Sequence, residues 1–421
     1  MAKSAKLIPQ DNLMSPRILL VTTNFWPEPS GTGPYATDLA LILKASGYEV
    51  QVLTGVPHYP WWEIPLSYKA NPSSWMNLEG IQVERQTHFV PRKLNIISRI
   101  LFEISLIRSL HSAFARINFA SYDLVIAIGS SVAGNLVAKR ISYRLKTPFG
   151  IIVHDLAGYG ISQSGLSGGY LIAKIVSGWE RLILESAKSV VAISQAMRDA
   201  MLRMGIQESK VRIIPIYAAN QVIPGNQVVA RRKFGWDSND FIVIHTGNMG
   251  AKQDLTNVVR ASEAIPTDLR IKIYLVGHGN QEYSLKEMCE DKKNIAVIPA
   301  VSGEDYSILL AAADLLLVNE RRTQRDMSLP SKLTSYLYSQ RPVLAAVPRE
   351  GATWKFLDGV ADLIEAGDPI ALARRIEELT RQPNKLRELA RLGREFAEEN
   401  LSPESGRKKY LEWVEELLMP M

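Results

Sequence analysis

The stretch Ile18-Leu-Leu-Val-Thr22 is a continuous apolar run, and a glycine-rich turn, Gly31-Thr32-Gly33, separates it from a helix expected over about Ala36–Ala45. A strand with one face in water alternates apolar and polar residues, so an unbroken run predicts a strand buried on both faces. The glycines allow backbone amides to approach a ligand, and the N-terminus of the helix favours an anion there. A purely structural turn explains the same glycines, and this alternative stays open.

Further apolar runs, separated by helical stretches, recur along the chain and restart after Pro215. Strands that alternate with helices predict a parallel, doubly wound sheet, and the restart predicts two of them. We therefore expect an α/β protein of two Rossmann-like domains, residues 1–217 and 218–402. A basic helix is expected to begin at Arg231, and a helix over about residues 403–421 is expected to pack back on the first domain. The other expected strands are Val50–Thr54, Leu124–Ile128, Phe149–Val153 and Val190–Ile193, then Phe241–His245, Ile271–Val276, Ile295–Ile298, Leu315–Val318 and Pro342–Ala346.

The composition is that of an ordinary globular protein, with 421 residues, 46% hydrophobic and 22% charged. Cys289 is the single cysteine, so no internal disulfide can form, and no Cys/His cluster predicts a zinc site. This cysteine usage favours a reducing, cytoplasmic setting. No apolar run reaches the length of a membrane span, which predicts a soluble or peripheral protein.

Positive charge is concentrated in the first half of the sequence. Residues 1–220 hold 22 Lys and Arg against 14 Asp and Glu, whereas the whole chain has a net charge of +6. Residues 91–110 carry Arg92, Lys93, Arg99 and Arg108 among more apolar residues than one buried helix stripe requires. Either this segment is a core helix, or part of it binds an anionic membrane surface at the inner face of the plasma membrane.

Lys252 follows the strand and flexible loop His245-Thr-Gly-Asn248-Met-Gly250 and is expected at the start of the next helix. A lysine at a helix N-terminus opposes the helix dipole, so a bound anion is the simplest explanation. The sequence therefore predicts a diphosphate contact for Lys252, with a solvated surface lysine as the alternative.

The segment Arg325–Leu337 predicts a second anion site, because it places proline at a helix start and Ser331 and Lys332 in the first turn. The spacing of a buried helix face leaves Ser331 and Lys332 to meet the ligand, unless this is only a capped surface helix. The residues with that spacing are Leu333, Tyr336 and Leu337.

Several loops follow the carboxyl ends of expected strands, where doubly wound sheets bind ligands. Gly277, Ile298 and Pro299 lie in two of them and are expected near a nucleoside. His278 is interpreted as a solvent-exposed loop residue. His154 closes another strand and is either a sugar ligand or a hydrogen-bonded core histidine.

The sequence contains no D-x-D or H-E-x-x-H motif, which removes the usual support for a metal-chelated diphosphate or zinc hydrolysis. No metal site and no cofactor are expected. The charge of a leaving diphosphate must then be met by amides, helix dipoles and Lys252 or Lys332.

The chain resembles the retaining GT-B glycosyltransferases of the family 4 kind, particularly those of colanic-acid biosynthesis. This resemblance spans nearly the whole chain and implies two Rossmann-like domains that face each other across a cleft. The motifs that carry it are Pro27–Tyr35, Pro57–Pro60, Val190–Ser194, Gly247–Gln253, Val276–Gly279 and Leu329–Thr334.

The resemblance implies an enzyme that moves a sugar from a nucleotide-diphosphate sugar to a sugar or lipid-linked acceptor, with retention and without a protein nucleophile or a metal. It implies that Lys252 and the segment Leu329–Thr334 contact the donor phosphates and that His154 touches the transferred sugar. The first domain would hold the acceptor and the second the nucleotide sugar; no nucleic acid is involved. The expected donor residues are Gly31, Gly33, Asn248, Gly277, Ile298, Pro299, Leu329, Pro330, Ser331 and Lys332, and the expected acceptor residues are Tyr35, His58 and Tyr59.

The chain departs from the family at three positions, one of which is Asn248, where relatives often carry arginine. Many relatives carry two glutamates, eight positions apart, where Met327 and Ser335 stand here. Asp326 is expected to replace the first in part, so it joins Lys252 and His154 as a candidate catalytic residue.

Two other functions share this architecture. A GT-B-fold epimerase acting on a nucleotide sugar would need acid and base carboxylates, and no convincing pair is visible. A non-catalytic subunit that binds sugar nucleotides fits the loss of the two glutamates. The transferase is the favoured interpretation.

Overall fold

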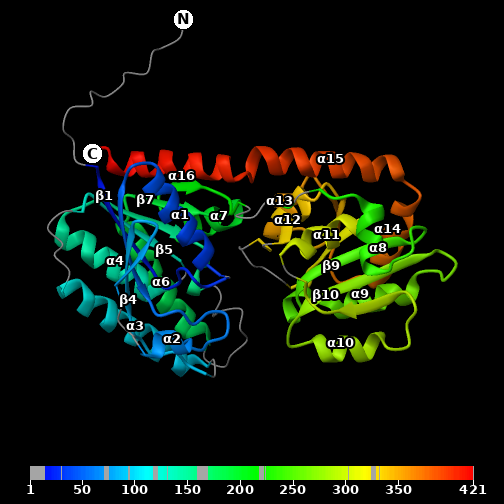
Figure 1. Ribbon diagram of the computed structural model, residues 1–421, viewed down its shortest axis with the longest axis horizontal. Coiled ribbons are helices and arrows are strands. Elements are labelled where there is room, and N and C mark those ends of the chain that lie inside the picture. The colour runs from blue at the N-terminus through cyan, green and yellow to red at the C-terminus, as the bar shows by residue number, and fades with distance from the viewer. Residues whose placement is uncertain are drawn as a thin grey trace, which may run out of the picture. The chain divides into compact units, whose positions relative to one another are not determined.

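The computed structural model forms two compact units (Figure 1). The first comprises Met1–Val191, Gly205–Arg212 and Tyr410–Met421, and the second comprises Ala192–Met204 and Ile213–Lys409. The structure describes residues 15–29, 31–70, 75–92, 95–116, 122–129, 131–158, 169–217, 222, 224–301, 303–323, 329–330 and 332–420.

The first unit is built on an eight-stranded sheet in the order β3-β4-β2-β1-β5-β6-β7-β8. The apolar run Ile18–Thr22 lies near the middle of this sheet in strand β1, which pairs in parallel with β2 and β5. β4 and β6 extend the parallel pairing, and β3 is antiparallel to β4. The strands are β1 Arg17–Thr22, β2 Glu49–Gly55, β3 Trp75–Leu78, β4 Ile81–Gln86, β5 Leu124–Ile128, β6 Phe149–Val153, β7 Ser189–Ala192 and β8 Val211–Ile213.

Helices connect these strands, as a doubly wound sheet requires. Helix α4 begins after Ser131, whose side chain accepts a hydrogen bond from the Gly134 amide, and ends at Lys146 in the left-handed conformation. The helical segments between the strands are α1 Gly33–Ala45, α2 Leu66–Ala70, α3 Ile96–Arg116, α4 Val132–Leu145, α6 Gly169–Ser186, α7 Gln195–Arg203 and the 3₁₀ turn η1 Glu208–Lys210.

Helix α16, Pro403–Leu418, contributes its second half to the first unit. Its Trp413 is buried, and the indole Nε1 donates to Ser189 Oγ at 2.9 Å. An added Cβ at Gly150 would lie 2.9 Å from the Trp413 ring, so the strand carries glycine where the indole packs.

The second unit has a six-stranded parallel sheet in the order β11-β10-β9-β12-β13-β14. The predicted α/β class with two doubly wound sheets is confirmed, and β11 has the predicted bounds. The strands are β9 Phe241–Asn248, β10 Ile271–His278, β11 Ile295–Ile298, β12 Leu315–Asn319, β13 Val343–Ala346 and β14 Asp362–Ile364. The helical segments are α8 Gln227–Phe234, η2 Ala251–Gln253, α9 Leu255–Ala264, α10 Glu282–Cys289, α11 Glu304–Ala312, α12 Lys332–Tyr338, α13 Ala352–Leu357, α14 Pro369–Thr380 and α15 Pro383–Asn400.

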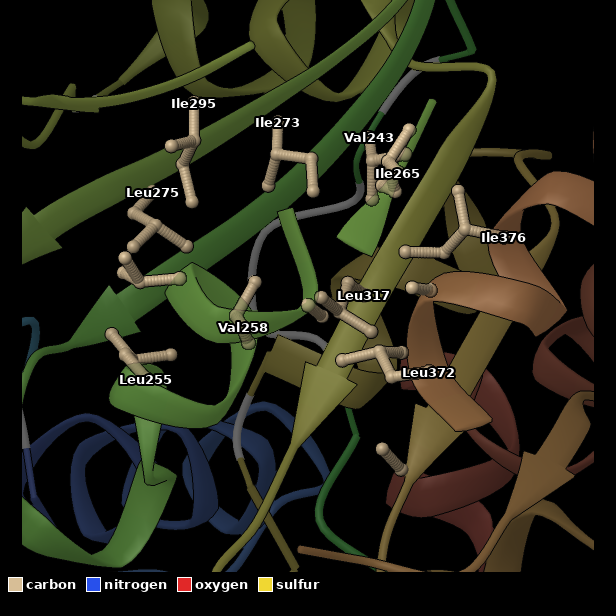
Figure 2. Close-up of a cluster of buried hydrophobic side chains, with 14 of the residues drawn as sticks. Val243, Leu255, Val258, Ile265, Ile273, Leu275, Ile295, Leu317, Leu372 and Ile376 are labelled. Carbon is tan, nitrogen blue, oxygen red and sulfur yellow. The ribbon is translucent and has the colours of Figure 1, made fainter. Parts of the chain in front are cut away.

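A core on each face of this sheet holds the second unit together. On one face, Val243, Leu275 and Leu317 of the strands pack against Val258 of α9 and Ile376 of α14 (Figure 2). Each fully buried side chain of this size stabilises the fold by about 1.5–3 kcal/mol. On the other face, the predicted apolar positions of α12 are 0–1% exposed, which confirms them as a buried helix face; they are Leu333, Tyr336 and Leu337.

The predicted start of a helix at Arg231 is wrong. Helix α8 begins earlier, because the Asn226 side chain accepts hydrogen bonds from the Val228 and Val229 amides. Arg231 therefore lies in the last turn, where its buried guanidinium pairs with Asp314.

None of the described helices is both long and apolar enough to cross a membrane.

Candidate functional sites

In the second unit, β9 and β10 end side by side in glycines. Gly277 pairs with Gly247 and His278 with Asn248. An added Cβ at Gly277, with φ +157°, would lie 1.8 Å from the Gly247 carbonyl oxygen, so any side chain there would collide with backbone. This sheet edge therefore presents bare backbone, and it brings the predicted donor residues Asn248 and Gly277 together.

Ile298 and Pro299 lie beside this edge. β10 and β11 pair in parallel with Val276 opposite Ile298, so Ile298 ends the neighbouring strand. Ile298 is half-buried and Pro299 is exposed. His278 is exposed, as predicted, and its Nδ1 lies 3.3 Å from Glu282 Oε2.

Lys252 lies in the 3₁₀ turn η2, and α9 begins after it, at Leu255. This differs from the expectation of a lysine at an α-helix start. Buried Asn319, at the end of β12, donates from Nδ2 to the carbonyls of Gln253 (2.8 Å) and Asp254 (3.0 Å). The Arg321 amide donates to the Lys252 carbonyl at 2.9 Å. The backbone of the turn is therefore held from β12, while the Lys252 side chain is exposed.

Lys332 is the first residue of α12, and its amine turns back onto β9. Its Nζ lies 3.1 Å from His245 Nε2 and 3.3 Å from Gln253 Oε1. An added Cβ at Gly247 would lie 3.4 Å from this Nζ. The predicted donor residue Lys332 thus comes to the same strand ends as Asn248.

Burial lowers the pKa of Lys332 from its usual value to about 7, although the Glu320 charge acts in the opposite direction. Burial also lowers the pKa of His245 well below its usual value, and the Lys332 charge adds to this shift. His245 therefore stays neutral. In the sequence, His245 stands out only as part of a motif, and no local pattern predicts its contact with Lys332.

Tyr336 joins α12 to the end of β9. Its hydroxyl accepts from the Thr246 amide at 2.7 Å, and Thr246 Oγ1 lies 3.1 Å from both the Tyr336 and Tyr306 hydroxyls. Burial raises the pKa of Tyr336, so the phenol stays neutral. These hydrogen bonds attach α12 to the end of β9, and Lys332 is the first residue of that helix.

The rest of the predicted α12 segment is only partly described. Leu329 and Pro330 are half-buried. Asp326, Met327 and Ser331 lie outside the described residues.

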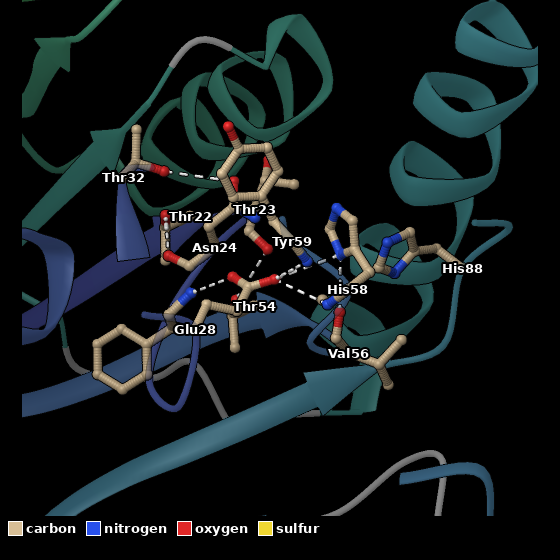
Figure 3. Close-up of polar contacts among 12 residues, drawn as sticks. Thr22, Thr23, Asn24, Glu28, Thr32, Thr54, Val56, His58, Tyr59 and His88 are labelled. Atoms are coloured by element: carbon tan, nitrogen blue, oxygen red, sulfur yellow. Dashed lines mark hydrogen bonds and ion pairs between the residues drawn. The ribbon is translucent and has the colours of Figure 1, made fainter. Parts of the chain in front are cut away.

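In the first unit, buried Glu28 joins the loops that follow β1 and β2. Its Oε1 accepts from the amides of His58 and Tyr59, both at 2.8 Å, and its Oε2 accepts from the Phe25 amide at 3.2 Å (Figure 3). His58 Nδ1 donates to the Val56 carbonyl at 3.0 Å. Glu28, which sequence analysis did not select, therefore positions two predicted acceptor residues.

Aromatic rings surround His58. The centroids of His88 and Phe102 lie 5.1 and 5.3 Å from it, and that of Trp62 lies 5.5 Å away. Burial, with the neighbouring His58, lowers the pKa of His88 to about 3. His88 is thus neutral at physiological pH.

The glycines of the first turn lie against these same residues. An added Cβ at Gly31, whose φ is +69°, would lie 2.9 Å from the Tyr59 ring, and one at Gly33 would lie 3.1 Å from Glu28. The structure brings Gly31, predicted for the donor, to Tyr59, predicted for the acceptor, and Gly33 to Glu28, which holds Tyr59.

His154 follows β6, and its ring centroid lies 5.5 Å from that of Tyr35 on α1. Burial lowers the pKa of His154 to about 4. A neutral imidazole of this kind can donate one hydrogen bond and accept another, but it carries no charge at neutral pH.

Each unit thus places polar groups at the carboxyl ends of parallel strands, the usual ligand position in such sheets. The second unit offers bare amides and lysines, which suit a polyanion. The first offers neutral histidines and aromatic rings. No group of three metal-ligating side chains occurs among the residues that the structure describes.

Two family models match the chain. Residues 30–216 match the glycosyl transferase 4-like domain, and residues 227–396 match glycosyl transferases group 1. Among curated proteins, the putative colanic acid biosynthesis glycosyl transferase WcaI of Escherichia coli (strain K12) is 26% identical over 413 residues, covering 94% of this chain and 98% of that protein.

Solved structures show the same fold. Sucrose-phosphate synthase from Thermosynechococcus elongatus matches with a TM-score of 0.71 at 16% identity, over 96% of this chain and 99% of that one. Anabaena HepE in complex with UDP matches with a TM-score of 0.68 at 17% identity, over 95% and 100%. WaaG, a glycosyltransferase involved in lipopolysaccharide biosynthesis, matches with a TM-score of 0.64 at 16% identity, over 94% and 99%. The fold is GT-B.

Proposed function

The chain belongs to the group 1 glycosyltransferases, and from this premise we propose that it moves a sugar, with retention, from a nucleotide-diphosphate sugar to an acceptor in polysaccharide or glycolipid synthesis. The second unit would hold the donor and the first the acceptor. The likeness to WcaI, named for colanic acid biosynthesis, supports the polysaccharide assignment.

The observation that carries this proposal is the group at the ends of β9 and β10. Bare backbone at Gly247 and Gly277 is accompanied by Lys332, whose amine has neutral acceptors as its hydrogen-bond partners among the described residues. A leaving diphosphate develops negative charge, and fixed cations and amides stabilise that charge in the transition state. The donor would therefore be bound by Lys252, Lys332, Asn248 and Gly277, with Ile298 and Pro299 beside the base.

The remaining roles follow from the first unit. His154, neutral and beside Tyr35, would hydrogen-bond the transferred sugar. Tyr59 and His58, held by Glu28, would line the acceptor site. Retention would proceed by front-face attack, with a donor phosphate oxygen taking the acceptor proton and Asp326 assisting at the donor sugar.

Incubation with single nucleotide sugars, with and without a crude glycolipid acceptor fraction, tests the proposal. HepE was solved with UDP-glucose, so UDP-glucose heads the panel, followed by GDP and ADP sugars. We expect acceptor-dependent release of nucleoside diphosphate that EDTA leaves intact. Interconversion of the sugar without an acceptor would indicate an epimerase, binding without either reaction would indicate a non-catalytic subunit, and full metal-reversible loss with EDTA would refute metal independence.

We also propose that the first unit binds an anionic membrane and draws its acceptor from it. Helix α3 has one face buried, including Phe102 and Leu106, and a second apolar face that is exposed. The exposed residues, spaced as i, i+3, i+4 and i+7, are Ile97 at 72%, Ile100 at 47%, Leu101 at 49% and Ile104 at 42%.

Exposed Arg108 lies on this apolar face, four residues after Ile104, whereas exposed Arg99 lies on the other side of the helix and exposed Arg92 precedes the helix. Each cation near an anionic surface contributes about 1 kcal/mol. Helix α3 also carries Phe102 against His58, so the exposed face belongs to the helix that lines the predicted acceptor site.

Vesicle sedimentation tests this interface. We expect binding to vesicles that contain anionic lipid, weakening as salt shortens the screening length. The double variant Ile97→Asn, Ile104→Asn should lose it, whereas Val229→Asn, at a residue that is 63% exposed in the second unit, should not. Equal binding by all three proteins, or none at low salt, would exclude the α3 interface and favour a soluble acceptor.

A further inference from the structure

His245 lies in β9 and is fully buried. Its Nδ1 is 3.0 Å from the Leu317 carbonyl on the adjacent strand β12. A carbonyl can only accept, so Nδ1 carries the proton and donates. The neutral ring must then present a lone pair at Nε2, the nitrogen that faces Lys332.

Lys332 is the donor to that lone pair. Its Nζ donates to His245 Nε2 at 3.1 Å and to Gln253 Oε1 at 3.3 Å. A protonated amine has three donors, so these contacts use two of them. A ligand at the bare edge beside Gly247 is within reach of the third, because Nζ lies against that glycine.

Two of the described residues contact this amine, and both are uncharged. From β9 it meets neutral His245, from η2 it meets the Gln253 amide, and Glu320, after β12, acts on it only over a longer distance. Glu320 is itself buried and accepts from Thr353 Oγ1 at 2.6 Å. Among the described residues, therefore, no carboxylate forms an ion pair with Lys332.

We propose that His245 is a positioning residue that holds the Lys332 amine at the donor phosphates, so that binding of a nucleotide sugar brings a proton from solvent onto this amine in each molecule where the amine was neutral. The amine becomes an ammonium, one N–H bond forms, and no other bond changes. This inference rests on the proposed function, because it needs a diphosphate at the ends of β9 and β10.

Nucleotide-sugar binding and protonation of Lys332 are coupled because the two charges attract each other. With a pKa of about 7, roughly half of the free protein carries the charged lysine at neutral pH. A diphosphate at hydrogen-bond distance favours the charged form and raises this pKa. Binding should then take up about 0.1 proton at pH 6, about 0.5 at pH 7 and about 0.9 at pH 8, and affinity should fall by about fifteenfold between pH 7 and 8.5.

Calorimetric titration measures this uptake directly. The full chain is titrated with UDP-glucose, GDP-mannose or ADP-glucose in pairs of buffers with different ionisation enthalpies at pH 6, 7 and 8. The diphosphate of a nucleotide sugar stays ionised throughout this range, so any proton taken up belongs to the protein. Lys332→Arg keeps a permanent charge, so this variant should bind with no uptake and no such pH dependence.

Two substitutions at His245 separate positioning from packing. The amide nitrogen of Asn takes about the place of Nδ1 and keeps the bond to Leu317, whereas the amide oxygen of Gln takes about the place of Nε2 and keeps an acceptor for Lys332. We expect His245→Asn to weaken nucleotide-sugar binding about tenfold, and His245→Gln to stay within about threefold of wild type. A merely structural role would weaken both alike.

A third measurement does not depend on a ligand. In the free protein, NMR titration of lysine Cε, with the signal assigned by its absence in Lys332→Arg, should give Lys332 a pKa near 7. A value near 10 overturns the inference. Tight binding without proton uptake also overturns it while the proposed function stands, and failure of every nucleotide sugar to bind removes both.

Discussion

Glu28 in the first unit and Lys332 in the second are both ionisable residues at the carboxyl ends of parallel strands, but their surroundings differ. The Glu28 carboxylate accepts hydrogen bonds from three backbone amides, those of Phe25, His58 and Tyr59. Within the part of the chain that the structure describes, the hydrogen-bond partners of the Lys332 amine are both neutral, His245 and Gln253.

This difference distinguishes a charged group that is satisfied within the fold from one that a bound ligand would satisfy. A buried carboxylate with three donors has its charge met within the fold. A buried ammonium with uncharged acceptors remains costly, so the protein tolerates it most readily when it is deprotonated or when an anion arrives. We therefore expect substitutions at the Glu28 group to act mainly on stability and those at the lysines to act mainly on donor use.

The largest expected effect is on turnover at the lysines. Lys252→Ala should lower transfer at least about a hundredfold, because it removes a cation from developing negative charge. Unfolding should change little, since this side chain is exposed. Initial rates at saturating donor measure the effect, and near-normal turnover would remove Lys252 from the phosphate site.

The next expected effect is on the stability of the first unit. Glu28→Gln keeps one oxygen but turns an NH₂ group toward one of three backbone donors, which should cost about 2 kcal/mol of unfolding free energy. Denaturant unfolding measures it, with Glu63→Gln, an exposed carboxylate in the same unit, as the control. If Glu28→Gln unfolds like its control, Glu28 does not hold the two loops.

A slightly smaller effect on the free energy of unfolding should appear at alkaline pH, and it arises in the second unit. The pKa of Lys332 is lower in the folded than in the unfolded chain, so between pH 7 and its usual pKa the unfolded state binds more protons and stability rises with pH. Relative to Lys332→Met, wild type should gain up to about 2 kcal/mol between pH 7 and 9. A constant difference between the two proteins over this range would contradict the depressed pKa.

The smallest expected effect is at acid pH in the first unit. The pKa of His154 is lowered to about 4, so its stabilising contribution is present above the ordinary histidine pKa and is lost as pH falls toward 4. Relative to His154→Gln, wild type should lose about 1 kcal/mol or more between pH 7 and 5. Thermal unfolding at the two pH values checks this, and parallel losses would place a charged imidazole in the folded state.

The sequence predicted the strands best where they are apolar throughout, as in β5, β6 and β11. It missed β4, which buries Glu84, Arg85 and Gln86. Such a strand has no apolar pattern of its own, because its polar side chains are accommodated by neighbours such as Gly55, whose carbonyl accepts from Arg85 at 3.4 Å.

The candidate site, like the strands, was predicted from the sequence only in part. The glycines at the ends of β9 and β10 can be recognised as a motif in the sequence. The structure explains why they are glycines, because the backbones of Gly247 and Gly277 lie in contact. His245 and Asn319 were missed, because their partners are 72 to 87 residues away for His245 and 62 to 66 for Asn319.

The sequence by itself determined the alternation of strands and helices, the two sheets and the buried face of α12. These features depend on local periodicity, which any window of the chain displays. Only the tertiary structure decided that the Lys332 amine turns back onto His245 and that Glu28 is tied to the loop after β2. Hydrogen-bond partners and desolvation are properties of groups brought together from distant positions, so the charge state of a residue cannot be read from its neighbours in sequence.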